Sequence, residues 1–113
     1  MSKTPEGRVK EEVKKIFAEF GVAAAAKVGG HNKGNGWYYM PTQSQFGTAG
    51  IPDFVGHIRG LFFAVETKAP GCKPTGFQAL QLATIAHTGA KAFVVDGSED
   101  SLAQLRTFLR GGS

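Results

Sequence analysis

The chain has 113 residues, of which 42% are hydrophobic, and carries a net charge of +4 with a pI near 9.4. This length fits one domain with one core, residues 1–113. The apolar runs are far too short to span a membrane, which excludes an integral membrane protein with helical spans. A small basic domain often binds a polyanion, because counterions released from phosphates favour association, although such charge also serves plain solubility.

Two features bear on the compartment of the protein. The segment 3–12 is rich in charge and lacks the apolar stretch of a signal peptide. The lone cysteine, Cys72, cannot form an intramolecular disulfide. We therefore expect a cytoplasmic, intracellular protein.

A first helix is predicted between residues 5 and 20. Thr4 is a suitable N-cap, Pro5 suits the first helical position, and Gly21 can end the helix. Apolar residues recur at helical spacing and form one stripe: Val9, Val13, Ile16, Phe17 and Phe20. Lys10, Glu11 and Lys14 are expected on the outer side.

The next segments are short and apolar. The alanine-rich residues 22–28 are compatible with either a strand or more helix. Residues 37–40 predict a strand between Gly36 and Pro41, with Trp37 in the core. Two further strands, 53–58 and 61–68, are separated by Arg59 and Gly60 and predict a hairpin.

The C-terminal third predicts two helices around one strand. Thr75 and Gln78 form a capping box for a helix that runs to about Thr88 and stops at Gly89. Residues 92–95 predict a strand buried on both faces. A closing helix over 99–109 carries four apolar residues inward: Leu102, Leu105, Phe108 and Leu109. The order α-β-β-β-α-β-α indicates an α/β protein with a mixed sheet flanked by helices.

The hairpin brings two acidic residues together. If Arg59 and Gly60 make a two-residue turn, paired positions sum to 119 and Asp53 lies opposite Glu66. Opposed carboxylates repel unless a cation lies between them, and oxygen ligands of this kind suit Mg²⁺. Arg-Gly is not a favoured hairpin turn, however, and Gly56 is compatible with a bulge that would shift the register.

Lys68 shares one face of its strand with Glu66, because side chains alternate along a strand. A lysine beside a metal site can orient an attacking water and offset charge that develops on a phosphate. The alternative is that Asp53, Glu66 and Lys68 form a surface cluster of ion pairs with no catalytic role.

These motifs resemble a known nuclease family. Pro52-Asp53, Glu66-Thr67-Lys68 and Gln78 occur in the order found in the PD-(D/E)xK nuclease superfamily. The segments 50–54, 63–71 and 73–75 more narrowly resemble the virus-type replication-repair nuclease (VRR-NUC) domains, in particular the stand-alone ones of phages and prophages. The resemblance implies a restriction-endonuclease-like αβββαβ core, dependence on Mg²⁺ or Mn²⁺, and hydrolysis of DNA phosphodiesters. A phage or bacterial origin is compatible with it.

The resemblance also assigns roles to individual residues. Asp53 and Glu66 would bind the metal together with the carbonyl of Thr67, and Lys68 would be catalytic. The family places a glutamate on the first helix, and Glu6 is the candidate because it projects onto the apolar stripe at 100° per residue, whereas Glu11 points nearly opposite. The alternative explanation for Glu6 is favourable placement of its charge at the positive N-terminal end of the helix.

Other roles stay open between function and structure. Gln78 matches a family glutamine that would contact the site or the phosphate, but it also completes the capping box. Three basic residues are candidates for lining a path for nucleic acid: Lys33, Arg59 and Lys73.

The expected function is a metal-dependent DNA endonuclease that prefers four-way junctions or other branched DNA and acts as a homodimer. The stand-alone domains that it resembles imply the dimer and the junction, and two cuts related by symmetry require two sites. The strand 37–40 and the closing helix with Leu105 and Phe108 are candidate dimer surfaces. The alternatives are a nuclease of linear or single-stranded DNA, another enzyme on the same fold, and a non-catalytic DNA-binding module.

Overall fold

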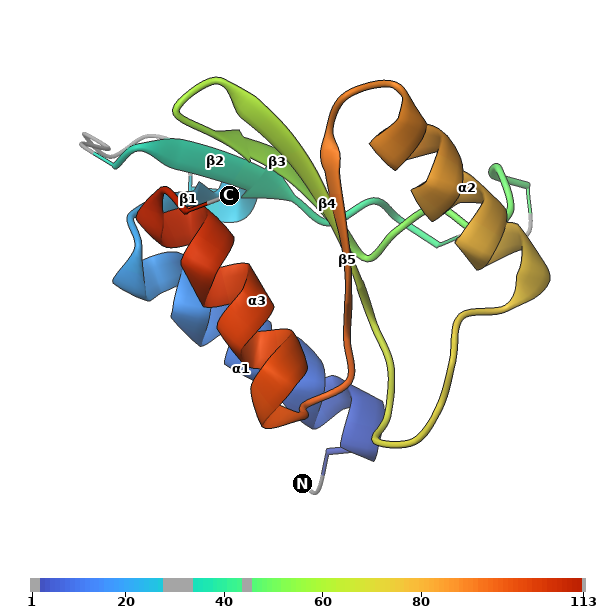
Figure 1. Ribbon diagram of the computed structural model, residues 1–113. Helices are drawn as coiled ribbons and strands as arrows, with labels where there is room; N and C mark the ends of the chain where they lie inside the picture. Colours follow the sequence, from blue (N-terminus) through green and yellow to red (C-terminus); the bar gives the residue numbers. More distant parts are fainter. Residues whose placement is uncertain (1–2, 28–33, 44–45, 113) are drawn as a thin grey trace.

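The computed structural model describes residues 3–27, 34–43 and 46–112 (Figure 1). Its elements follow the order α1 (Pro5–Glu19), β1 (Val22–Ala24), the 3-10 turn η1 (Ala25–Lys27), β2 (Gly36–Tyr39), β3 (Phe54–Ile58), β4 (Leu61–Thr67), α2 (Gly76–His87), β5 (Lys91–Val95) and α3 (Glu99–Arg110). The expected α/β class with a mixed sheet is confirmed. No helix in these ranges is both long and apolar enough to cross a bilayer.

The five strands form one sheet in the order β1-β2-β3-β4-β5. The neighbours β2, β3 and β4 run antiparallel, whereas the outer pairs β1–β2 and β4–β5 are parallel. The sequence predicted three strands before α2 and the structure has four. The alanine-rich segment was compatible with a strand or with more helix, and it forms both, because the strand β1 leads directly into the helical turn η1.

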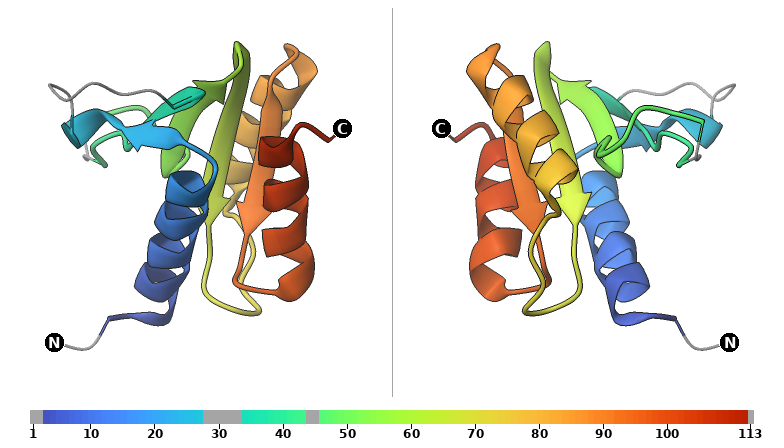
Figure 2. Two further views of the ribbon diagram at one scale, coloured as in Figure 1. Left: turned by 90° about the vertical axis from the view of Figure 1, so that its left-hand side faces the viewer. Right: turned by 90° about the vertical axis from the view of Figure 1, so that its right-hand side faces the viewer.

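Helices cover the two faces of the sheet unequally. Helices α1 and α3 pack together against one face, while α2 lies on the other face over β4 and β5 (Figures 1 and 2). The helix ends agree with the predicted caps, since the side chain of Thr4 accepts from the N–H of Gly7 and that of Thr75 accepts from the N–H of Gln78. These caps hold the helices at defined positions beside the sheet.

The core lies between the sheet and the pair α1–α3. Phe17 of α1 is fully buried, and its ring lies 4.6 Å from that of Tyr38, 5.3 Å from Phe63 and 5.5 Å from Phe54, centroid to centroid. Helix α3 contributes the predicted apolar face, with Leu105, Phe108 and Leu109 buried and Leu102 partly buried. Interlocking rings of this kind stabilise the contact between helix and sheet beyond simple burial.

Three predictions about apolar residues are wrong. Trp37 is 40% exposed, because Tyr38 and not Trp37 packs against Phe17, and alternation along the strand then turns Trp37 to the other face. The last strand, β5, is not buried on both faces, since Val94 is 40% exposed and the strand lies at the edge of the sheet. Leu105 and Phe108 are occupied in the core and cannot form a dimer surface.

The predicted hairpin register is confirmed. Paired residues of β3 and β4 sum to 119, from Ile58↔Leu61 to Phe54↔Val65. Arg59 and Gly60 both have positive φ, 49° and 78°, as the tight hairpin turn requires. Gly56 is not a bulge but a close approach of strands, because an added Cβ would lie 2.1 Å from the carbonyl oxygen of Trp37 on β2.

Candidate active site

The site forms where the hairpin opens, at the end opposite its turn. Glu66 and Thr67 end β4, and Asp53 directly precedes β3, one position beyond the paired residues Phe54 and Val65. The preceding loop is fixed against α2, because Gly50 has a φ of 79° and an added Cβ would lie 2.5 Å from the backbone of Phe77. The segment before Asp53 therefore depends on a glycine at this position.

Thr67 orients Asp53. The Oδ2 atom of Asp53 accepts hydrogen bonds from the backbone N–H of Thr67 at 2.8 Å and from its hydroxyl at 2.7 Å. The side chain of Thr67 is fully buried, and its hydroxyl finds its hydrogen-bond acceptor in the carboxylate of Asp53. Its role was not predicted from the sequence, although a buried threonine beside an acidic pair is a signal that such a bond exists. The two bonds leave Oδ1 as the more available oxygen of Asp53.

Glu66 is buried without full compensation. Its side chain is 2% exposed; Oε2 lies 3.7 Å from the ammonium of Lys68, and Oε1 has no hydrogen-bond partner. Burial, and next the negative charge of Asp53, raise the pKa of Glu66 to about 7, while Lys68 acts in the opposite direction. A buried carboxylate oxygen that lacks a partner is costly, so this atom is available for a ligand.

Lys10 of α1 also reaches the site, which corrects the expectation that it faces outward. Its Nζ lies 3.6 Å from Oδ1 of Asp53 and 3.5 Å from Oε2 of Glu6. A long aliphatic stem allows a lysine on the flank of a helix to carry its charge to a neighbouring element. Glu6 is therefore connected to Asp53 through Lys10, whereas Glu11 pairs with Lys3 and Lys14.

The remaining candidates lie elsewhere. Gln78 forms the predicted capping box, in which its Oε1 accepts from the N–H of Thr75 at 2.9 Å; a role at the phosphate stays a prediction. Arg59, at the hairpin turn, donates to the carbonyl oxygens of Leu109 and Phe108 at 3.0 and 3.2 Å. Lys73 is exposed in the loop after β4, and Lys33 lies outside the described residues.

One observation indicates that the carboxylates of Asp53 and Glu66 fit a divalent cation. One oxygen of Glu66 is buried and unpartnered. Burial and, next, the neighbouring carboxylate of Asp53 raise the pKa of Glu66, and a cation between the two carboxylates would offset their repulsion. The described residues contain no cluster of three His, Cys, Asp or Glu side chains suited to a metal. A cation here would therefore need further oxygen ligands from the backbone, water or substrate, as Mg²⁺ commonly accepts.

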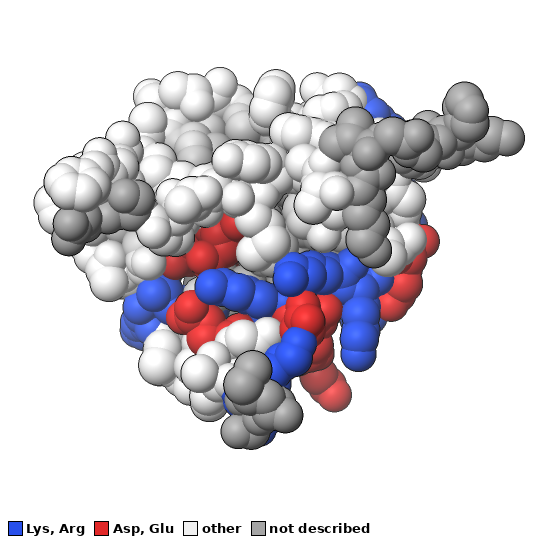
Figure 3. All heavy atoms as spheres, turned by 180° about the vertical axis from the view of Figure 1, so that it is seen from behind, with Lys and Arg blue, Asp and Glu red and all other residues white. Residues whose placement is uncertain are grey.

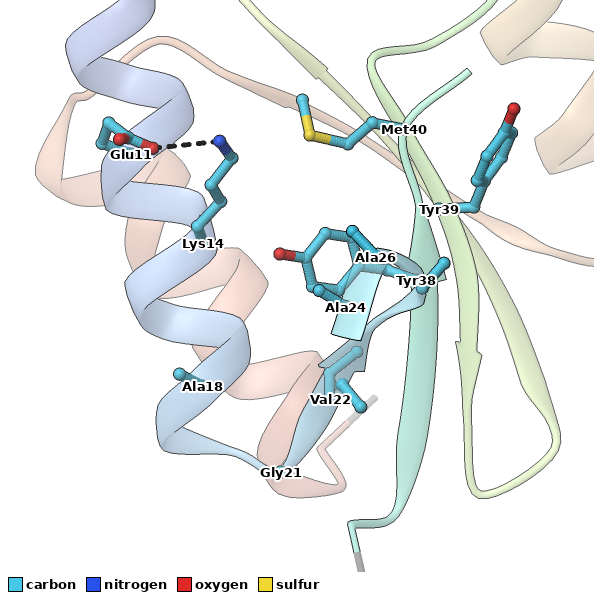
Figure 4. A pocket seen from close by; sticks show the side chains of 12 residues that line it. Glu11, Lys14, Ala18, Gly21, Val22, Ala24, Ala26, Tyr38, Tyr39 and Met40 are labelled. Atoms are coloured by element: carbon cyan, nitrogen blue, oxygen red, sulfur yellow. Dashed lines mark ion pairs between the residues drawn. The ribbon is translucent and has the colours of Figure 1, made fainter. Parts of the chain in front are cut away.

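A pocket lined by described residues lies away from these carboxylates. It has a volume of about 860 Å³ and lies between α1 and the β1–β2 edge, where the hydroxyl of Tyr38 points toward the Lys14–Glu11 ion pair (Figure 4). Five of its twelve lining residues are alanine, and neither Asp53, Glu66 nor Lys68 lines it. The candidate site is thus separate from this pocket, and its side chains are only slightly exposed: 11% for Asp53, 2% for Glu66 and 12% for Lys68.

Charged side chains are also unevenly distributed over the molecule. Seen from behind, basic and acidic side chains gather in one band, and the area above this band is almost free of them (Figure 3).

Comparison of the chain with protein-family models, with curated proteins and with solved structures gave no match.

Proposed function

We propose that this protein is a magnesium-dependent nuclease that hydrolyses DNA phosphodiester bonds, with Mn²⁺ able to replace Mg²⁺. The observation that carries the proposal is the placement of Asp53 close enough to Glu66 for their charges to interact at the open end of the hairpin, with one buried oxygen of Glu66 left unpartnered. Such an arrangement is costly in a purely structural role, because like charges are held together under partial desolvation.

In this proposal the residues of the site have two separate roles, metal binding and orientation of the attacking water. Asp53 and Glu66, with the carbonyl of Thr67, would hold the metal, and Thr67 keeps Asp53 oriented through two hydrogen bonds. When bound, the metal would polarise the phosphate and acidify a water. Lys68, 3.7 Å from Glu66, would orient the attacking water and offset charge on the phosphate.

The fold supports the same proposal by analogy. The order of elements and the positions of Asp53, Glu66 and Lys68 are compatible with the restriction-endonuclease-like αβββαβ core of the VRR-NUC domains that the sequence resembles. In this interpretation β2, β3 and β4 with the parallel strand β5 form the core sheet, and β1 and α3 are additions. Fold alone does not determine chemistry, so the carboxylate pair carries the argument.

We further propose that the enzyme acts on branched DNA as a homodimer. Side chains of three adjacent strands form a row on the sheet face opposite α1, which we call the aromatic row: Trp37, Tyr39, His57 and Phe62. All of them except His57 are exposed. None of these side chains is a lysine or arginine, so the row brings no permanent positive charge to DNA phosphates. An exposed aromatic surface of this kind suits a second copy of the chain.

The test is a cleavage assay on matched linear, flap and four-way substrates with and without Mg²⁺. We expect Asp53→Asn, Glu66→Gln and Lys68→Met each to lower cleavage by about a hundredfold or more, as is typical for loss of acid–base or electrostatic groups. Lys91→Met, which removes an exposed lysine on β5, is the control and should cut at the wild-type rate.

Each alternative predicts a different result. A non-catalytic binding module would bind these substrates but cut none of them with any divalent metal. A nuclease of linear or single-stranded DNA would cut those substrates faster than the junction. Cleavage at the wild-type rate by Asp53→Asn or Glu66→Gln would contradict the site itself.

A further inference from the structure

Lys10 occupies the oxygen of Asp53 that a metal would need. Because Thr67 binds Oδ2 through two hydrogen bonds, Oδ1 is the more available oxygen, and the ammonium of Lys10 lies 3.6 Å from it. The same ammonium lies 3.5 Å from Oε2 of Glu6, one turn earlier on α1. Lys10 is therefore shared between an acidic group of the site and an acidic group of its own helix.

The two lysines near the carboxylates differ in their freedom to move. Lys68 follows Glu66 by two residues and is 12% exposed. Lys10 comes from a separate element, is 31% exposed, and has a second acidic partner within reach. Glutamate four residues before lysine is also the favourable orientation for a helical ion pair. Lys10 can thus leave Asp53 without losing a partner for its charge.

We propose that Lys10 is a built-in counter-ion that holds Asp53 in the metal-free protein and that an incoming divalent cation displaces it onto Glu6. This inference rests on the proposed function, since it takes Asp53 as a metal ligand. A divalent cation and an ammonium compete for the same oxygen, and the higher charge of the metal favours its contact with the carboxylate. Glu6 is then a positioning residue that acts through Lys10 and not a ligand.

The proposal predicts opposite effects for two substitutions. Without the competing ammonium, Lys10→Met should bind the metal about threefold to fivefold more tightly, the range of a partly exposed ion pair. Glu6→Gln removes the alternative partner of Lys10, so the ammonium stays on Asp53 and metal binding should weaken by about twofold to threefold. The double variant should behave like Lys10→Met alone, because Glu6 has nothing to position once Lys10 is gone.

The experiment is a titration of each variant with Mn²⁺, in which the electron paramagnetic resonance signal of the free ion gives the dissociation constant without any cleavage. Lys14→Met is the matched control, because it removes the same charge from the same helix where the partner is Glu11. It should change the dissociation constant by less than about twofold, since surface charges at a distance are screened. Thermal unfolding of each variant verifies that the fold is retained.

Two outcomes would overturn the proposal. If Lys10→Met binds Mn²⁺ no more tightly than Lys14→Met does, Lys10 does not compete with the metal. If the double variant is as weak as Glu6→Gln, then Glu6 acts on the metal directly and not through Lys10. Asp53→Asn separates these failures from failure of the proposed function. If that variant binds Mn²⁺ as tightly as the wild type does, Asp53 is not a metal ligand, and both the proposed metal site and the proposal about Lys10 are wrong.

Discussion

The two ends of the β3–β4 hairpin use charge in opposite ways. At the turn, the guanidinium of Arg59 donates to two carbonyl oxygens at the end of α3, and the backbone N–H of Arg59 donates to Asn35. At the open end, two carboxylates lie together and an oxygen of Glu66 is buried without a partner. Polar groups of Arg59 at the turn are paired, whereas at the open end the pairing is incomplete, because Oε1 of Glu66 has no hydrogen-bond partner although Asp53 and the other oxygen of Glu66 have partners.

The contrast indicates which end is under functional demand. A helix C-terminus has unpaired carbonyls, and the cation of Arg59 satisfies two of them, so its placement needs no other explanation. Nothing comparable explains the burial of Glu66 beside Asp53 in the absence of a ligand. Substitutions at the two ends should therefore change stability in opposite directions.

The largest effect is expected at the open end. Folding raises the pKa of Glu66 to about 7, so between its ordinary value of 4.5 and about 7 the folded state binds more protons than the unfolded state. The metal-free protein should lose stability as pH rises through this range. Replacement of Glu66 by glutamine should remove this loss, which amounts to at most about 3.4 kcal/mol at pH 8 at 1.36 kcal/mol per pKa unit.

Urea unfolding at pH 5 and pH 8 in the presence of a chelator measures this effect as the difference between wild type and Glu66→Gln. The charged groups that face Glu66 are Asp53 and Lys68, and they are unchanged in the variant. Glu11→Gln is the control, since Glu11 is a carboxylate paired with lysines on the surface of α1. Parallel loss of stability in wild type and Glu66→Gln from pH 5 to pH 8 would refute the assigned cause.

This end of the hairpin could be predicted from the sequence because short-range rules determine it. A two-residue turn and strict alternation place Asp53 opposite Glu66, and the pairing of β3 with β4 follows that register. Helix ends were predictable for the same reason, since Thr4, Thr75 and Gln78 act on N–H groups within three residues.

The parts that sequence reasoning missed depend on contacts between distant segments. Residues 36–39 read Gly-Trp-Tyr-Tyr, so alternation does not decide which aromatic residue faces the core, and Phe17 of α1 selects Tyr38. The strand β1 has three residues and gains its partner only when β2 lies beside it. Lys10 reaches Asp53 only because α1 packs beside the open end of the hairpin.

A smaller effect is expected at the turn. Arg59→Ala should destabilise the protein by about 2 kcal/mol through loss of the charged hydrogen bonds to the end of α3. Arg59→Gly loses the same bonds but relieves the positive φ of 49°, so it should be about 1 kcal/mol more stable than Arg59→Ala. Thermal or urea unfolding of the two variants measures the difference.

Cleavage assays on these two variants sharpen the contrast between the ends. If Arg59 serves only the turn, both variants should cut DNA at the wild-type rate below their melting temperatures. A loss of DNA affinity that is equal in Arg59→Ala and Arg59→Gly would instead assign Arg59 to the nucleic-acid path considered from the sequence. Equal stability of the two variants would mean that the backbone at position 59 is not strained.

The smallest effect on stability is expected in the middle of the hairpin, at the aromatic row. Phe62 is 65% exposed and Trp37 is 40% exposed, so Phe62→Ser combined with Trp37→Thr should change the unfolding free energy of the monomer by less than about 1 kcal/mol. Both substitutions leave the open end and the turn of the hairpin unchanged.

If the aromatic row joins two copies of the chain, the double variant should be monomeric where the wild type is dimeric, because the apolar surface at the contact is lost. Light scattering at micromolar concentration with and without a four-way junction measures this change, and Phe77→Ser, on the exposed outer surface of α2, is the matched control. The monomeric variant should keep its Mn²⁺ affinity, since the proposed metal site lies within one chain, but should lose paired cuts at a junction, because two sites related by symmetry are then no longer held together. A wild-type protein that is monomeric under both conditions would refute the homodimer without affecting the carboxylate site.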